Sequence, residues 1–339
     1  MANPIEVLIT LPFSDEMLSP LRLLSPRLRI TSLKARKIEE IPEETWNDVE
    51  VLYTNRILPL PEQAPHLRWI QFHWAGIDHV ADAPVLKMEG VQITTLSGVA
   101  TSQMAEYAVM MLLALGHRLP DLIANQRRGE WPADRWERFS PVELRGSKVG
   151  IVGYGSIGRQ VARLLHEFGA TILATKRDAM HPKDTGYSLE GMGDPEGDLV
   201  ERLYPPQALR SMLREADFVV VTVPLTQDTH NLIGAEELEA MPPNSFLVNI
   251  SRGGIVEPNA LLQALREHKI AGAALDVFAE EPLPPDHPLW KLPNVFITPH
   301  ISGNTSHYDE NALAFFIENM QRYLTGAPLH NLYDPRSGY

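Results

Sequence analysis

The sequence predicts an α/β protein built on parallel β-sheets. Two observations favour this class. Short apolar runs alternate with helical patterns along almost the whole chain, and a glycine-rich turn joins one buried strand directly to a helix. The length of 339 residues is enough for two domains, each with its own hydrophobic core.

In the first part of the chain, apolar and β-branched runs predict strands. They lie at Val7 to Leu11, Val51 to Thr54, Trp69 to Phe72 and Val91 to Thr95. A long helix is expected next, because apolar residues at helical spacing form one face. That face consists of Met104, Ala108, Met111, Leu115 and Leu119. A loop rich in Trp and Arg, residues 127–139, follows it.

From Lys148 onward, strands and helices alternate regularly. The predicted strands are Val149 to Val152, Thr171 to Ala174, Phe218 to Val223, Phe246 to Ile250, Ala273 to Phe278 and Val295 to Thr298. The helix after the first of them has an apolar face of Ile157, Val161, Leu164, Leu165 and Phe168. Further helices are expected near Pro206 to Glu215, Pro258 to His268 and Tyr308 to Leu324. Met180 to Pro205, rich in Gly, Pro, Asp and Glu, is interpreted as a surface loop.

Composition excludes several classes of function. The formal net charge of -13 argues against nucleic-acid and membrane-surface partners. The absence of cysteine excludes disulfides, thiolate metal sites and a cysteine nucleophile, and no other metal-ligand pattern stands out. No apolar run approaches the roughly 20 residues that span a bilayer. We therefore expect a cytoplasmic protein without a metal.

The glycine-rich turn is the first candidate binding site. It runs G-Y-G-S-I-G from Gly153 to Gly158, after a strand and at the start of a helix, which is the context of a dinucleotide fingerprint. Gly153 permits the tight turn, and Gly155 lets the backbone approach a pyrophosphate. The amides of Ser156, Ile157 and Gly158 would then face the phosphates at the positive end of the helix dipole. The alternative is a glycine turn without a ligand.

The end of the next strand bears on which nucleotide is bound. An NAD site usually has an acidic residue there, which binds the ribose 2′-hydroxyl. Lys176 and Arg177 occupy this place and would attract a 2′-phosphate. In the alternative interpretation both are solvated and Asp178 binds the ribose. The sequence favours NADP over NAD.

Ordered motifs along the chain resemble a known family. They are Gly153 to Gly158, then V-P-L-T from Val223, N-I-S-R-G-G from Asn249, D-V-F-A-E-E-P from Asp276, and T-P-H from Thr298. The sequence resembles the D-isomer-specific 2-hydroxyacid dehydrogenases, among them the glyoxylate/hydroxypyruvate reductases. The resemblance implies two Rossmann-like or flavodoxin-like domains with the active site in the cleft between them. Residues 1–101 and 304–339 would form the substrate domain, and residues 102–303 the dinucleotide-binding domain.

The resemblance also implies the chemistry. The protein would reversibly reduce a small 2-oxo acid to the D-2-hydroxy acid with NAD(P)H. Arg252 would bind the substrate carboxylate, which suits its planar fork of donors. His300 would be the general acid and base, and Glu281 would be its partner.

Further site residues follow from the same resemblance. The amides of Ala75 and Gly76 would hold the substrate carboxylate, and the preceding His73 and Trp74 either narrow the pocket or pack against the domain. The expected cofactor contacts are Gly153, Gly155, Ser156, Ile157, Gly158, Lys176, Arg177, Val223, Pro224, Ile250, Asp276 and Gly303. A homodimer is expected through the long helix and the loop after it, from which Trp131 or Trp136 could reach a neighbouring site.

Two rival functions remain open. One is a phosphite or formate dehydrogenase on the same fold, although the formate branch carries glutamine where this chain has Glu281. The other is a nicotinamide-sensing corepressor, which binds a cofactor but acts through protein binding. Measured turnover separates a sensor from an enzyme.

Overall fold

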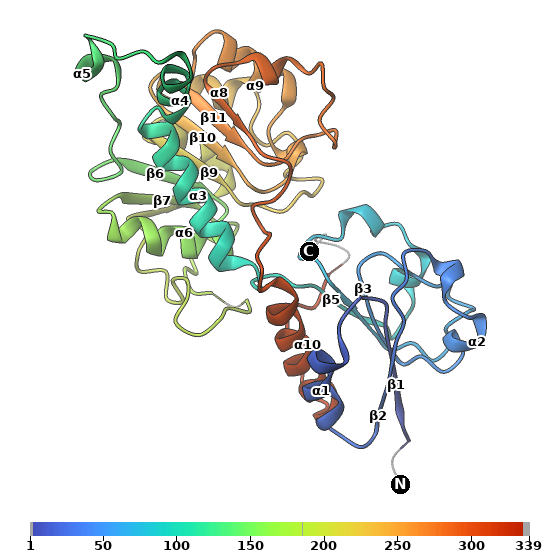
Figure 1. The fold of residues 1–339 in the computed structure, drawn as a ribbon. Coiled ribbons are helices and arrows are strands. Elements are labelled where there is room, and N and C mark those ends of the chain that lie inside the picture. Colours follow the sequence, from blue (N-terminus) through green and yellow to red (C-terminus); the bar gives the residue numbers. More distant parts are fainter. Residues whose placement is uncertain (1–2, 185, 335–339) are drawn as a thin grey trace. The chain divides into compact units, whose positions relative to one another are not determined.

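The computed structural model describes residues 3–184 and 186–334. The chain forms two compact units, one made of Met1–Val99 with Thr305–Tyr339 and the other of Ala100–Asn304 (Figure 1). The first unit is therefore discontinuous in sequence, and the second is one uninterrupted stretch.

The first unit is built on a five-stranded parallel sheet of order β2-β1-β3-β4-β5. Its strands are β1 (Ile5–Ile9), β2 (Leu28–Ser32), β3 (Val51–Thr54), β4 (Trp69–Phe72) and β5 (Gln92–Thr94). This is the flavodoxin-like strand order. Both faces of the sheet are apolar, because Val7 and Ile9 belong to one buried cluster and Leu8 to another. The central strands β1, β3 and β4 are therefore largely buried on both sides, as is typical of parallel sheets, whereas the edge strand β2 is partly exposed.

Helices cover this sheet. They are α1 (Asp15–Leu23), α2 (Glu43–Trp46) and α10 (Tyr308–Thr325), with short 3-10 turns at Ile38–Glu40, Asp78–Val80 and Pro84–Lys87. Although α1 and α10 come from opposite ends of the chain, they lie side by side (Figure 1). Phe316 and Met320 of α10 are fully buried in the cluster that contains Val7 and Ile9. The C-terminal helix thus completes the core of the N-terminal sheet.

The second unit is built on a seven-stranded parallel sheet of order β12-β11-β10-β9-β6-β7-β8. Its strands are β6 (Lys148–Val152), β7 (Thr171–Thr175), β8 (Arg202–Tyr204), β9 (Phe218–Val221), β10 (Phe246–Asn249), β11 (Gly272–Leu275) and β12 (Val295–Ile297). The strand order reverses between β6 and β9, which are neighbours in the sheet. Doubly wound sheets bind their ligands at the carboxyl ends of the strands beside such a reversal.

Helices pack on both faces of the second sheet. The helices of this unit are α3 (Thr101–Gly116), α4 (Leu119–Arg128), α5 (Arg135–Arg138), α6 (Ser156–Glu167), α7 (Leu209–Leu213), α8 (Ala235–Ala240) and α9 (Pro258–Arg266), with 3-10 turns at Pro206–Ala208, Gly253–Ile255 and Pro288–Lys291, and α5 has no buried residue. The cluster on one face contains residues of α3 and α6, and the cluster on the other contains residues of α7, α8 and α9. The predicted fold class, two parallel-sheet α/β domains, is confirmed.

Three local predictions were wrong. The expected long helix is two helices bent by 62°. It breaks after Gly116, where Arg118 adopts a left-handed φ of 51° and leaves Leu119 partly exposed. The predicted loop from Met180 to Pro205 contains β8, a short edge strand. Phe168 follows α6 as its C-cap and is 43% exposed, outside the apolar face assigned to it.

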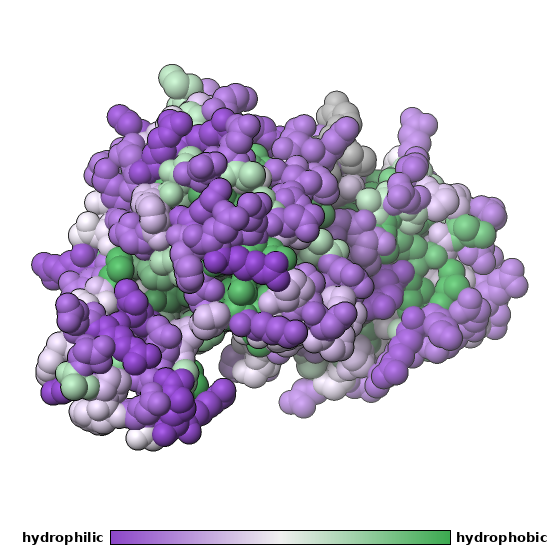
Figure 2. All heavy atoms as spheres, turned by 90° about the horizontal axis from the view of Figure 1, so that it is seen from above, coloured by the Kyte–Doolittle hydropathy of each residue, from purple (hydrophilic) through white to green (hydrophobic). Residues whose placement is uncertain are grey.

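Hydrophilic residues cover most of the face seen in Figure 2, with hydrophobic residues in smaller patches between them. Over residues 3–184 and 186–334, no single helix has the length and apolar character to cross a membrane. Within these described residues, the bent pair of α3 and α4 meets the two criteria when its helices are taken together.

Candidate functional site

Three neighbouring strands of the second unit supply the residues expected to do the chemistry. Arg252 follows β10, Glu281 lies in the loop after β11, and His300 follows β12. These strands are adjacent and parallel, so their carboxyl ends lie at the same edge of the sheet. The sheet therefore brings together segments that are distant in sequence.

His300 and Glu281 form a direct contact. The distance between His300 Nδ1 and Glu281 Oε2 is 2.8 Å. The other oxygen, Glu281 Oε1, accepts a hydrogen bond of 2.9 Å from the backbone N–H of Phe278. Glu281 is therefore fixed by its own loop and in turn fixes the imidazole ring, whose Nε2 lies on the opposite side. The side chains of His300 and Glu281 are 45% and 35% exposed, so the pair is open to a reactant.

Asp276 holds the segment that carries His300. Its side chain is fully buried. Its carboxylate accepts hydrogen bonds from the N–H groups of Ile301 at 2.9 Å and Ser302 at 2.8 Å, and from Thr298 Oγ1 at 2.6 Å. The carbonyl of Asp276 accepts from His300 N at 2.8 Å. These bonds stabilise His300 in a left-handed conformation with φ of 53°, which non-glycine residues seldom adopt.

Tyr107 of α3 extends this network, because its hydroxyl contacts Thr298 Oγ1. Burial raises the pKa of Tyr107 to about 12, so the hydroxyl keeps its proton at neutral pH. The sequence assigned Asp276 to the cofactor but did not reveal its hold on the His300 segment. Tyr107 was missed altogether, since nothing in the sequence links α3 to the end of β12.

Arg252 lies on a turn that packs against the loop of Glu281. Arg252 is half-buried, and its Nη1 donates to the carbonyl of Ser251 at 2.8 Å. Asn249 Nδ2 donates to the carbonyl of Arg252 at 3.1 Å and so fixes the turn. A Cβ atom at Gly253 would lie 1.8 Å from the backbone carbon of Phe278. Only glycine permits this approach between the two loops.

The glycine turn is held from both sides. Gly153 has a φ of 105°, a conformation open to glycine. Its N–H donates to Thr175 Oγ1 at 3.0 Å, and its carbonyl accepts from Thr222 Oγ1 at 2.7 Å. These threonines end β7 and follow β9, the strands on either side of β6. Sequence reasoning missed both threonines, although each lies at the carboxyl end of a strand, beside the point where the strand order reverses.

The turn fits a dinucleotide. Ser156, Ile157 and Gly158 begin α6, where helical geometry gives the amide groups no carbonyl partner within the helix. A Cβ atom at Gly155 would meet nothing within 4 Å, so the space beside its backbone is open. An open backbone face and a helix N-terminus are the features that receive a pyrophosphate.

The adenosine side of this site has mixed charge. Lys176 Nζ donates to the carbonyl of His181 and, at 3.1 Å, to that of Lys183, while Arg177 is exposed. Asp178 Oδ2 lies 2.7 Å from His181 Nδ1, and this hydrogen bond lowers the pKa of the Asp178 carboxyl. A basic pair and an alternative carboxylate thus stand together after β7, as the sequence indicated.

The remaining expected cofactor residues also follow strands of the second unit. Val223 contacts the glycine turn, since its Cγ1 would lie 2.7 Å from a Cβ at Gly153. The carbonyl of Pro224 accepts from Thr229 Oγ1 at 2.6 Å, Ile250 is buried, and the carbonyl of Gly303 accepts from Gln103 Nε2 at 3.0 Å. Over residues 3–184 and 186–334, no group of three or more His, Cys, Asp or Glu residues is arranged to hold a metal ion.

The expected carboxylate-binding amides belong to the first unit. Ala75 and Gly76 follow β4, and in the described part of the chain neither N–H donates to a backbone carbonyl. His73 is buried in the domain core, with Nδ1 3.0 Å from the Tyr53 hydroxyl and Nε2 3.2 Å from Asp309 Oδ1. Of the two interpretations for His73, the structure supports packing within the domain. Trp74 beside it is 41% exposed.

Comparisons with known proteins identify the family to which the chain is similar. A sequence model described as "D-isomer specific 2-hydroxyacid dehydrogenase, NAD binding domain" matches residues 109–302. Over 270 residues the chain is 35% identical to a glyoxylate reductase from Thermofilum pendens, covering 78% of this chain and 74% of that protein.

Solved structures show the same architecture. A D-isomer specific 2-hydroxyacid dehydrogenase from Xanthobacter autotrophicus Py2, in complex with NADPH and MES, matches with a TM-score of 0.78 and 28% identity over 100% of both chains. An NADPH-dependent glyoxylate/hydroxypyruvate reductase from Sinorhizobium meliloti, in complex with NADP and sulfate, matches with a TM-score of 0.77 and 25% identity over 99% of this chain and 100% of that one. The chain therefore belongs to the D-isomer specific 2-hydroxyacid dehydrogenase family, as its motifs predicted, and is an NAD(P)-dependent enzyme of this family.

Proposed function

We propose that this enzyme reversibly reduces a small 2-oxo acid of the glyoxylate or hydroxypyruvate type to the D-2-hydroxy acid, with NADP preferred over NAD. The relatives named above support the substrate class, since they are glyoxylate or glyoxylate/hydroxypyruvate reductases. The observation that carries the proposal is the contact of 2.8 Å between His300 Nδ1 and Glu281 Oε2.

Each residue has a defined task in the reduction. The guanidinium of Arg252 binds the substrate carboxylate as a fork of donors, and the amides of Ala75 and Gly76 bind it as well. A bound nicotinamide coenzyme supplies the hydride to the carbonyl carbon. As the C=O π bond breaks, His300 donates a proton from Nε2 to the carbonyl oxygen, which gives the hydroxyl group. Glu281 orients the ring and stabilises its protonated form.

The preference for NADP rests on Lys176 and Arg177. Lys176 uses two of its three donor positions on loop carbonyls and keeps one for a 2′-phosphate. Two solved relatives carry NADPH or NADP. Asp178 would instead favour the 2′-hydroxyl of NAD, but its carboxylate is paired with His181.

The test follows NADPH and NADH oxidation in parallel by absorbance, with glyoxylate, hydroxypyruvate, pyruvate and a branched 2-oxo acid. We expect turnover with glyoxylate or hydroxypyruvate, faster with NADPH, and loss of most of it in Arg252→Ala. Arg266→Ala, at an exposed arginine of α9, is the matched control. Turnover with NADH alone would refute the NADP preference. Cofactor binding without turnover on any substrate would favour the corepressor-like sensor. Reduction of NAD⁺ or NADP⁺ by phosphite or formate, in a separate assay, would favour that rival enzyme.

A cytoplasmic homodimer is part of the proposal. Trp131 and Trp136 are 84% and 81% exposed, and Met110 and Leu122 nearby in the sequence are also exposed. Such large apolar side chains are expected to be covered by a partner subunit. Sedimentation of the protein should therefore give twice the mass of one chain, and a Trp131→Ala/Trp136→Ala variant should shift it toward the monomer.

A further inference from the structure

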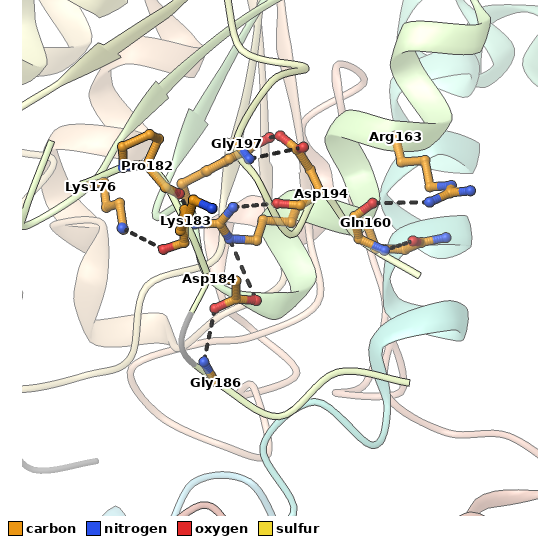
Figure 3. A network of polar contacts seen from close by, with 12 residues as sticks. Gln160, Arg163, Lys176, Pro182, Lys183, Asp184, Gly186, Asp194 and Gly197 are labelled. Atoms are coloured by element: carbon orange, nitrogen blue, oxygen red, sulfur yellow. Dashed lines mark hydrogen bonds and ion pairs between the residues drawn. The ribbon is translucent and has the colours of Figure 1, made fainter. Parts of the chain in front are cut away.

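The segment 178–199, which connects β7 to β8, is organised around one buried carboxylate. Asp194 Oδ1 accepts hydrogen bonds from the N–H groups of Gly197 at 3.1 Å and Asp198 at 3.0 Å, and Oδ2 accepts from Leu199 at 3.1 Å. Figure 3 shows Asp194 beside Gly197 at the centre of this network. Residues 178–184 and 186–199 have no regular secondary structure, yet hydrogen bonds hold their backbone at defined positions.

Two side chains connect Asp194 to the glycine turn. The hydroxyl of Tyr154, the second residue of the G-Y-G-S-I-G motif, donates to Asp194 Oδ2 at 2.5 Å. Arg159, the residue directly after Gly158, donates from Nη1 to the carbonyl of Asp194 at 2.5 Å. The Arg159 guanidinium lies 4.6 Å from the centre of the Tyr154 ring. One residue within the fingerprint and the residue directly after it thus both contact Asp194.

Arg159 also contacts residues near the beginning of the segment. Its Nη2 donates to the carbonyl of Pro182 at 2.5 Å, and its Nε lies 3.6 Å from Asp184 Oδ2. The side chain is only 1% exposed. Burying a guanidinium is costly unless charged and polar partners replace water, and this segment supplies those partners. The burial of Arg159 on α6 therefore depends on this segment, and the segment in turn is held in place by Arg159.

Further contacts secure the segment along α6. Gln160 Oε1 accepts from Gly193 N at 2.6 Å, and Arg163 Nη1 donates to the carbonyl of Gly193 at 3.3 Å. At the other side, Lys176 donates to the carbonyl of Lys183 (Figure 3). It also donates to the carbonyl of His181. None of these contacts involves Arg252, Glu281 or His300. Their common element is the segment itself, which α6 contacts on one side and the residue after β7 on the other.

We propose that Asp194 is a positioning residue for the cofactor: acting through Tyr154 and Arg159, it braces the glycine turn in the conformation that receives the pyrophosphate. The proposal rests on the proposed function, because it assumes that the turn binds NADPH. Without this brace, ordering the turn costs part of the binding free energy. The brace therefore changes cofactor affinity more than the rate of the chemical step.

The primary test is the dissociation constant for NADPH, measured by the fluorescence of the bound cofactor in the full-length protein. Tyr154→Phe keeps the ring under Arg159 and removes the hydroxyl. Losing a hydrogen bond to a carboxylate should raise the Kd about fivefold to tenfold. The kcat at saturating NADPH should stay within about twofold of the wild-type value, which separates affinity from chemistry.

The matched control is Tyr323→Phe in the first unit. Its hydroxyl also donates to a carboxylate, Glu50 Oε1, at 2.7 Å. The two variants lose the same kind of bond, so urea denaturation should show similar losses of stability. Only Tyr154→Phe should weaken NADPH binding. Equal Kd values for both variants and the wild type would refute the claim that Asp194 positions the glycine turn. Asp194 would then stabilise only its own loop.

A double-mutant cycle tests the route through Tyr154. If Asp194 acts through Tyr154, the Tyr154→Phe/Asp194→Ala variant should bind NADPH about as weakly as Asp194→Ala alone. If the double variant instead raised the Kd by the product of the two single factors, Asp194 would not act through Tyr154. Should Asp194→Ala fail to fold, Asp194→Asn takes its place in the cycle.

The two proposals fail in different ways. If the wild-type protein binds NADPH and the Tyr154 and Asp194 variants bind it equally well, only the brace is wrong. If the wild-type protein binds neither NADPH nor NADH, both proposals are overturned.

Discussion

Gly253 offers the sharpest test of how the site is held together. A Cβ atom at this position would lie 1.8 Å from the backbone carbon of Phe278 and 2.2 Å from the nitrogen of Ala279. All the close atoms belong to the backbone, so no side chain can rotate away. In Gly253→Ala the two loops must therefore separate by about 1.7 Å to restore a carbon–carbon contact of about 3.5 Å.

That displacement acts on Glu281, whose Oε1 is bonded to Phe278 N and so moves with this loop. A shift of half that size along the line to His300 would lengthen the contact of 2.8 Å beyond hydrogen-bond range. Misplacement of about 1 Å can reduce the rate of an enzyme about 10²-fold. We expect a loss of that order in kcat/KM, with a cost of about 1–3 kcal/mol in the free energy of unfolding from overpacking.

Gly254→Ala is the matched control, because the added Cβ would meet Leu225 at 3.4 Å, an ordinary contact. Both variants would be assayed by NADPH oxidation with glyoxylate and by urea denaturation. Gly253→Ala should lose activity while the glycine turn still binds NADPH. Wild-type kcat/KM in Gly253→Ala, or equal losses in both variants, would refute the claim that this close approach positions Glu281.

The other predictions concern single side chains. Glu281→Gln should lower kcat/KM for glyoxylate about tenfold, since a charged hydrogen bond is lost, and an unchanged value would refute its role. Lys176→Glu should reverse the ratio of kcat/KM for NADPH to that for NADH, and an unaltered ratio would rule out Lys176 as a phosphate ligand. Burial lowers the pKa of His73 from its ordinary value of 6.5 despite Asp309 beside it. The unfolded state therefore binds more protons, and the free energy of unfolding should fall as pH drops below 6.5. His73→Gln should flatten this dependence between pH 7.5 and 5.5, and an equal slope would contradict it.

Sequence alone predicted the strands that are buried on both faces. Val51–Thr54 and Trp69–Phe72 lie in the structure at the expected positions, because short, continuously apolar runs are characteristic of parallel sheets. The edge strands β2 and β8 were missed. In β2 half-exposed and exposed residues alternate, and β8 has only three residues, too few for a periodic signal. The break after Gly116 did have a signal, since Pro120 closely follows it.

The contact between Glu281 and His300 was predictable because the motifs that contain them follow strand ends, whereas the residues that support this pair were not. Glu281 and His300 were paired by resemblance, and the structure places them in contact. The hydrogen bonds of Asp276 to the His300 segment depend on how one strand end meets the next. The contact of Tyr154 with Asp194 joins residues 40 positions apart across an irregular segment. Such pairs follow no short-range pattern, and only the folded chain reveals them.

The interleaved order of the two units has a consequence for biosynthesis. Ribosomes release the chain from its N-terminus, so β1 to β5 emerge first and α10 last, with the entire second unit between them. Until then, the face of the nascent sheet that contains Val7 and Ile9 lacks the apolar cover of Phe316 and Met320. The contiguous second unit can complete its core in the meantime. The unit whose strands are synthesised first therefore completes its hydrophobic core last, when α10 has emerged.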